Sequence, residues 1–322
     1  MKRFFIAFLA FTGVCAGQQS PGPKAILEPR PPKPGSAEFS SRPNIRVDST
    51  LVLIPVTVTD PLNRFVTGLE RQDFTLLEDN QPQEIVSFSS EDTPVSIGLV
   101  FDCSGSMGEK LRKAREAVAH FLKRANPEDE FFLVQFNSEA SLVQPFTLDT
   151  REIQNRLMFS QSKGRTALLD AVYRAIHETR NARSPRKAIL IISDGGDNNS
   201  RYSEGEIKSL VKEADVQIYA IGIYEPFGSR MRTSEEAGGP ALLTHIAQQT
   251  GGRQYSIENV SELADVAAKI GVELRNQYVL GYAPRNQLRD GKYRRVQVKL
   301  KPVRGLPPLR AFWRMGYFAP TE

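Results

Sequence analysis

The sequence has few of the residues from which disulfide frameworks and zinc sites are built. Among its 322 residues there are two cysteines, Cys15 and Cys103, and three histidines. Two cysteines form at most one disulfide, and no HExxH motif or paired Cys/His spacing indicates zinc. A Gly-x-Ser-x-Gly turn is also missing, so a serine hydrolase is not indicated. The histidines all fall in predicted helices, at His120, His177 and His245.

Long hydrophobic runs are also missing, apart from one run of eleven residues at positions 4–14. It follows two basic residues and ends in small ones, which is typical of a secretory signal peptide. The run is too short to span a membrane as a helix. We predict a signal peptide at residues 1–16, cleaved after Ala16, and a secreted or periplasmic protein with no transmembrane segment in the mature chain. An uncleaved anchor, or a lipoprotein modified at Cys15, are the weaker alternatives.

A strong charge of one sign is missing as well. The formal net charge is +5, with 25% charged and 40% hydrophobic residues, so composition indicates a globular protein and no specific nucleic-acid binding. One stretch, residues 289–314, has nine basic residues and one acidic residue. Because the basic residues alternate with apolar ones, we interpret them as the solvated face of a sheet. Binding of a polyanion remains the alternative.

Composition divides the rest of the chain into a linker and three further segments. Residues 18–43 include seven prolines, which is typical of an extended spacer, and we assign residues 17–45 to a Pro-rich linker. The segments that follow are a first β region at residues 46–92, an α/β domain at residues 93–274 and a second β region at residues 275–322.

The middle segment alternates apolar strands with amphipathic helices. The runs SIGLVF and AILII are apolar throughout, which is typical of parallel strands buried on both faces. Between them, one helix places Leu111, Ala114, Val118 and Phe121 on a single face. The pattern predicts an α/β fold with a doubly wound, mostly parallel, Rossmann-like sheet that has helices on both faces.

The first flanking region alternates apolar and polar residues with the period of two that is typical of half-buried strands. Its apolar positions are Val52, Ile54, Val56 and Val58. Pro55 among them predicts an edge strand. A turn-forming cluster at residues 79–82 predicts two further short strands around it.

The second flanking region contains three predicted strands, in residues 277–284, 292–303 and 309–318. Neither flanking region is long enough to bury a core alone. We therefore expect the two regions to pair into one small, split, all-β sandwich-like region, with the α/β domain inserted between them.

Oxygen-bearing side chains follow two of the predicted α/β strands and begin one of the helices. Asp102, Ser104 and Ser106 follow SIGLVF, Thr166 opens a helix, and Asp194 follows AILII. Ligands of open α/β sheets bind beyond the carboxyl ends of the strands, so we expect these side chains to meet there. Hard oxygen donors suit Mg²⁺ or Mn²⁺ and suit Zn²⁺ or copper poorly. We predict a Mg²⁺ site, with Mn²⁺ or Ca²⁺ as alternatives, and no catalytic residue.

The runs DCSGSM, GRTALLDAV and ILIISDGGDN resemble the metal-ion-dependent adhesion site of the von Willebrand factor type A (VWA) family. The resemblance covers about residues 93–274, and the flanks resemble the VWFA-related family of secreted bacterial proteins. Cys103 stands where that family often has Thr or Asn, and we expect its side chain to point away from the ion. The resemblance implies metal ligation, direct or through water, by Asp102, Ser104, Ser106, Thr166 and Asp194.

The function that follows is a secreted protein-interaction or adhesion module, which binds an acidic residue of a protein partner through Mg²⁺. One alternative is a Mg²⁺-dependent phosphohydrolase of the haloacid dehalogenase type, with Asp102 as nucleophile. That chemistry needs a second carboxyl group two residues later, where this chain has Ser104. Phosphatase activity on an aryl phosphate would distinguish the two. Another alternative is a metal-independent structural envelope protein.

Overall fold

The computed structural model describes residues 51–224, 234–303 and 305–321, without the side chains of residues 234–237. The predicted signal peptide and Pro-rich linker lie outside the described residues. A six-stranded sheet in the order β10-β9-β8-β5-β6-β7 forms the centre of the α/β domain. Its strands are β5 (Ser96–Asp102), β6 (Glu130–Phe136), β7 (Ala140–Thr147), β8 (Lys187–Ser193), β9 (Gln217–Ile223) and β10 (Gln254–Ile257). All neighbours are parallel except β6 and β7, which confirms the predicted mostly parallel sheet.

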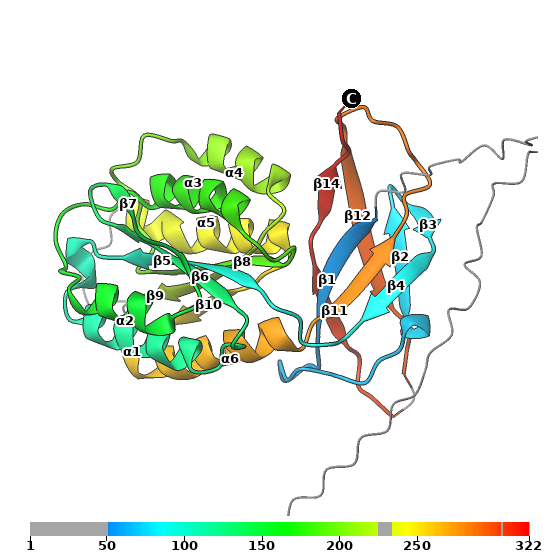
Figure 1. Cartoon of the computed structure of the whole chain (residues 1–322), viewed down its shortest axis with the longest axis horizontal. Helices are drawn as coiled ribbons and strands as arrows, with labels where there is room; N and C mark the ends of the chain where they lie inside the picture. The colour runs from blue at the N-terminus through cyan, green and yellow to red at the C-terminus, as the bar shows by residue number, and fades with distance from the viewer. Residues whose placement is uncertain (1–50, 225–233, 304, 322) are drawn as a thin grey trace, which may run out of the picture. The chain divides into compact units, whose positions relative to one another are not determined.

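Helices cover both faces of this sheet (Figure 1). On one face lie α1 (Lys110–Leu122), α2 (Thr150–Met158) and α6 (Leu263–Arg275), and on the other lie α3 (Leu168–Glu178), α4 (Glu204–Glu213) and α5 (Ser234–Thr250). Successive residues of β5 pack on opposite faces of the sheet. Leu99 and Phe101 belong to the hydrophobic core under α1, α2 and α6, and Val100 belongs to the core under α3, α4 and α5. In the described part of the chain, none of the helices combines the length and apolar character needed to cross a bilayer.

The order of the strands reverses between β5 and β8. From β5 the chain continues to β6 on one side, and later returns to β8 on the other side. The two connections therefore leave the sheet in opposite directions, which opens a crevice beyond the carboxyl ends of β5 and β8. Asp102 is the last residue of β5, and Asp194 directly follows β8. The topology thus places both carboxylates at the switch point.

The strands that flank the α/β domain pair with one another. Two four-stranded sheets have the orders β13-β1-β11-β4 and β14-β12-β2-β3. The strands are β1 (Val52–Thr59), β2 (Phe74–Glu78), β3 (Gln81–Gln83), β4 (Ile85–Ser89), β11 (Tyr278–Tyr282), β12 (Tyr293–Leu300), β13 (Arg310–Trp313) and β14 (Gly316–Phe318). Since β1 lies between β11 and β13, and β2 pairs with β12, both sheets use strands from both flanking regions. The expected split β region is confirmed, while the domain boundaries stay predictions.

Three details of the β region differ from the prediction. β1 is an interior strand, although Pro55 predicted an edge. The partner β13 begins only opposite Val56, so the position of Pro55 requires no amide hydrogen bond on that side. The single strand expected at residues 309–318 is divided into β13 and β14, which pair with different sheets.

The turn near residue 79 is also shorter than predicted. Only Asp79 and Asn80 adopt positive φ angles, of 47° and 67°, which is the backbone of a two-residue hairpin turn. Gln81 and Pro82 already belong to β3, so three strands form where two were expected.

Buried polar side chains join the α/β domain to the β region. Gln277, between α6 and β11, donates from Nε2 to Thr57 Oγ1 at 3.2 Å and to the Tyr219 hydroxyl at 3.1 Å. Nearby, Glu273 accepts a hydrogen bond from the Tyr255 hydroxyl at 2.7 Å, and burial raises the pKa of this carboxyl. Strands β1 and β9 are therefore linked by hydrogen bonds that water does not reach.

Candidate metal centre

The backbone turn after β5 fixes the carboxylate of Asp102. A short 3₁₀ turn, Gly105–Met107, follows the strand. Asp102 Oδ1 accepts a hydrogen bond from the N–H of Ser104 at 2.8 Å, and Oδ2 accepts one from the Ser193 hydroxyl at 2.5 Å. The carboxylate is fully buried, so its position is set by these two bonds and by its surroundings.

Hydroxyl groups connect this turn to Asp194. The Oγ atoms of Ser104 and Ser106 lie 3.0 Å apart, and Ser106 Oγ donates to Asp194 Oδ1 at 3.0 Å. The other oxygen of Asp194, Oδ2, accepts a hydrogen bond from Lys110 Nζ at 3.1 Å. Four of the five predicted ligands therefore belong to one hydrogen-bonded group.

Thr166 lies at the same edge of the sheet and is held through its backbone. Its N–H donates to Asn198 Oδ1 at 2.9 Å, and its carbonyl accepts from the N–H groups of Asn198 and Asn199 at 3.0 and 3.1 Å. The Gly105 N–H donates to the Gly164 carbonyl at 3.0 Å, which ties the Thr166 loop to the serine turn. Within the described residues, the Thr166 hydroxyl makes no hydrogen bond to the other four predicted ligands.

The loop that carries Asp194 depends on glycine. Gly195 has a φ angle of 97°, in a region that residues with side chains rarely adopt. A Cβ atom at this position would also lie 2.6 Å from the ring of Tyr224. The Asp194-Gly195 sequence thus lets the chain turn away directly after the carboxylate.

The charges of the site favour an added cation. Burial, and next the charge of Asp194, raise the pKa of Asp102 to about 7, although hydrogen bonds from Ser104 and Ser193 act in the opposite direction. A positive ion beside the two carboxylates would stabilise the ionised form of Asp102. Protonation of Asp102 and cation binding are therefore alternatives.

This competition predicts that pH affects the stability of the metal-free protein. Between about pH 4 and pH 7 folded Asp102 keeps a proton that the unfolded chain has released, so the free energy of unfolding falls as pH rises through this range. The proton on Asp102 contributes at most about 4 kcal/mol to the free energy of unfolding. Chemical unfolding in chelator at several pH values would measure it. The control is Asp102→Asn, which should remove this part of the dependence of the unfolding free energy on pH. The prediction is contradicted if the wild type and Asp102→Asn show the same dependence on pH.

Cys103, between Asp102 and Ser104, belongs to the hydrophobic core that includes Met107 and Leu111. It is a free cysteine and is buried. Burial, with a smaller effect of the Asp102 charge, raises the pKa of the thiol to about 12. The thiolate, which is the reactive form, is therefore scarce, and Cys103 acts as a packed apolar residue.

Sequence reasoning did not find three of the residues that shape this site. Ser193 bonds Asp102, Lys110 pairs with Asp194, and Asn198 holds the Thr166 backbone. Ser193 and Asn198 lie in the same ILIISDGGDN run as Asp194, so their position after a buried strand was an available signal. Lys110 was not distinguishable in sequence from the other basic residues of its helix.

The open sheet, with its oxygen-rich crevice at the switch point, defines an α/β domain of the Rossmann-like class. The sequence profile of the von Willebrand factor type A domain matches residues 96–269, more than half of the chain. The protein belongs to the von Willebrand factor type A domain family.

Several known proteins are similar to this chain. An uncharacterized protein of Borreliella burgdorferi is 25% identical over 184 residues, which are 51% of this chain and 54% of that protein. Inter-alpha-trypsin inhibitor heavy chain H4 of Bos taurus is 28% identical over 134 residues, 38% of this chain and 15% of that protein. The chain thus spans about half of the first relative and less of the second. A solved von Willebrand factor type A structure from Catenulispora acidiphila has a TM-score of 0.49 at 14% identity, over 85% of this chain and 74% of that one.

Proposed function

We propose that this protein is an exported adhesion-type module, which uses a Mg²⁺ ion at the switch point to bind a carboxylate of a protein partner. Domains of its family are generally interaction modules and not enzymes. The observation that carries the proposal is the hydrogen-bonded group of Asp102, Ser104, Ser106 and Asp194 at the end of β5 and β8.

The donors of this group fit a hard divalent cation. Among the described residues no three His, Cys, Asp or Glu side chains gather as a metal-binding cluster. An ion here would depend on two carboxylates and on hydroxyl groups, and Mg²⁺ is often held by one or two carboxylates while it keeps several waters. When bound, it would supply an electrophilic position for an incoming carboxylate. The residues that would hold it, directly or through water, are Asp102, Ser104, Ser106, Thr166 and Asp194.

The surface beside the site supports a protein partner. Phe159, at the end of α2, is 83% exposed, and Met158 is 68% exposed. The loop after them is joined to the serine turn, because Lys163 N–H donates to the Cys103 carbonyl at 2.9 Å and Ser162 Oγ donates to the Ser104 carbonyl at 2.5 Å. A single carboxylate–ion contact needs surrounding contacts to become strong, and this loop offers large apolar side chains for them.

The first test is calorimetric titration of Mg²⁺ and Mn²⁺ into the chelator-treated protein. We expect binding of one ion per chain. Proteins captured by the immobilised chain in Mg²⁺ should then be released by EDTA. The proposal is wrong if neither ion binds, or if capture is undiminished in chelator.

A further inference from the structure

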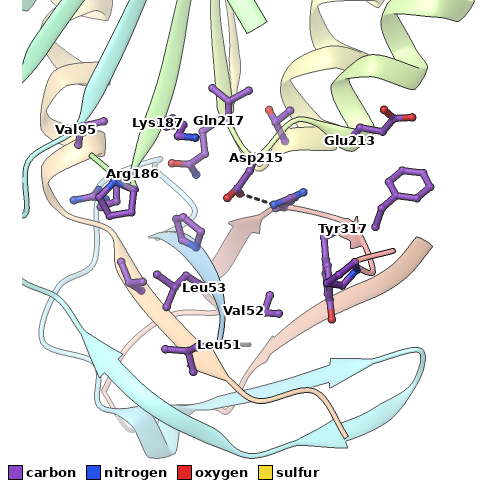
Figure 2. A pocket seen from close by; sticks show the side chains of 18 residues that line it. Leu51, Val52, Leu53, Val95, Arg186, Lys187, Glu213, Asp215, Gln217 and Tyr317 are labelled. Atoms are coloured by element: carbon purple, nitrogen blue, oxygen red, sulfur yellow. Dashed lines mark hydrogen bonds and ion pairs between the residues drawn. The ribbon is translucent and has the colours of Figure 1, made fainter. Parts of the chain in front are cut away.

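A second candidate site lies at the opposite edge of the six-stranded sheet from Asp102 and Asp194. A cavity of about 370 Å³ opens at the amino ends of β8 and β9 (Figure 2). Residues of β1, β11 and the segment 314–320 complete its walls. The volume lies within the range of about 300–1,000 Å³ that small-molecule sites occupy.

The first feature of this cavity is an amide without a partner. Gln217, the first residue of β9, is only 7% exposed, and in the described part of the chain its Nε2 atom has no hydrogen-bond partner. Buried polar side chains are nearly always hydrogen-bonded, so an exception requires an explanation. Gln217 lines the cavity, and its Nε2 atom has almost no accessible surface, so an acceptor bound there would supply the missing partner once the amide turns toward it.

The second feature is positive charge beside this amide. Lys187, at the start of the neighbouring strand β8, lines the same cavity and lies on the same side of it as Gln217 (Figure 2). It is half-buried, and none of the described residues forms an ion pair with it. Arg186 adds a second positive charge, although its own hydrogen bonds go to Thr93, to Gln277 and to the Leu274 carbonyl.

Two acidic residues also line the cavity. Asp215 is paired with Arg314 at 2.5 Å, and Glu213, the last residue of α4, is exposed to solvent. Figure 2 shows Glu213 away from Lys187, whereas Asp215 is drawn beside Gln217 with its carboxylate directed at its ion-pair partner, Arg314. Because Arg314 neutralises Asp215, Lys187 and Arg186 leave the Lys187–Gln217 end positive, which favours an anionic group there. The exposed Glu213 disfavours an anionic group at the other end.

The third feature is an apolar wall opposite these donors. Leu51 and Leu53 are 44% and 40% exposed and face Lys187 and Gln217 across the cavity (Figure 2). The neighbouring residues of β1, Ile54 and Val56, are buried in the β core. This strand is thus apolar on both faces, although only one face packs against the core.

From these three features we propose that the cavity binds a small carboxylic acid with an apolar body. The carboxylate accepts hydrogen bonds from Gln217 Nε2 and from the Lys187 ammonium, and the apolar body lies against Leu51 and Leu53. The proposal does not involve the candidate metal centre.

Calorimetric titration with sodium decanoate tests this proposal. Titrations are made in EDTA, so that a carboxylate cannot bind through a divalent ion. We expect one decanoate to bind per chain. Decanol and decyltrimethylammonium lack the anionic group, so their affinity should be lower than that of decanoate by a factor of roughly ten or more, as the loss of a charged hydrogen bond predicts. Absence of decanoate binding at millimolar concentration overturns the proposal, as does equal binding of decanol.

Variants assign the binding to this cavity. Gln217→Leu and Lys187→Met should each weaken decanoate binding roughly tenfold, and Leu53→Ser should weaken it independently of the donors. Lys299→Met, on the exposed side of β12, is the matched control and should bind as the wild type does. Because Gln217 is buried, its replacement can disturb the fold, so Gln217→Leu is used only if its thermal unfolding is cooperative. If it is not, the two variants Lys187→Met and Leu53→Ser decide the outcome. Unchanged affinity in both shows that the cavity is not the site.

Discussion

Replacing Asp194 by alanine is expected to lower the affinity for Mg²⁺ at least about 100-fold, while the α/β domain stays folded. Loss of a residue that only orients a metal ligand costs about 10–100-fold, and Asp194 is one of the two carboxylates of the candidate site. Burial and, next, the charge of Asp194 raise the pKa of Asp102; the variant removes the second of these unfavourable effects, so we expect the domain to stay folded. Ser104→Ala should likewise weaken binding. Calorimetry and thermal unfolding of each variant measure the two effects.

Two further variants make this prediction specific. Ser200 is a hydroxyl of a neighbouring loop that bonds Asp197, and Ser200→Ala should leave Mg²⁺ affinity unchanged. Lys110 donates to Asp194 Oδ2, so it competes with an ion for this carboxylate, and Lys110→Met should raise the affinity a few-fold. Equal Mg²⁺ affinity in the wild type and Asp194→Ala contradicts the assignment of the site.

Removing residues 278–322 is expected to unfold the β region and to cause aggregation. The truncation takes both partners of β1 and the partner β12 of β2. It also removes Tyr278, Leu280 and Val298 from the core. Strands left without partners expose backbone groups that pair with other chains. Size-exclusion chromatography and circular dichroism should show aggregates and a loss of strand signal.

The matched control for this truncation is a fragment of residues 93–277. It keeps the six-stranded sheet and helices α1 to α6 of the described residues, and we expect it to remain soluble and to unfold cooperatively. A monomeric chain ending at residue 277, with the strand content of the whole protein, would show that the two flanking regions do not depend on each other.

The α/β fold was predictable because its signals are local. The strands β5 and β8 are apolar at nearly every position, and helices such as α1 show a single apolar face. In the β region the number and order of strands depend on distant pairing. The division between β13 and β14 follows from their partners β1 and β12, which the residues at 309–318 do not specify by themselves.

The predicted ligands of the candidate site could be found from the sequence, but the residues that position them could not. Asp102, Ser104, Ser106 and Asp194 follow buried strands, and topology alone brings the ends of neighbouring parallel strands together. The positions of Lys110 and Ser193 depend on side-chain rotamers and on the close approach of two loops. The Nε2 atom of Gln217, which has no hydrogen-bond partner among the described residues, could not be foreseen either. The residue lies in a strand whose sequence is mostly apolar, and only the packed structure shows what it faces.

The pairing of β1 with β11 also has a consequence for the time course of folding. Val52 lies opposite Tyr282, so at a synthesis rate of roughly 5–20 residues per second β1 waits roughly 10–50 seconds for its partner. The α/β domain is made as one uninterrupted stretch within this interval and has neighbouring elements to pack against. Strands β1 and β4, which both pair with β11, meanwhile remain unpaired, with apolar side chains on both faces of β1. A holdase that shields strand edges is therefore expected to raise the yield of the whole chain and to have little effect on the 93–277 fragment.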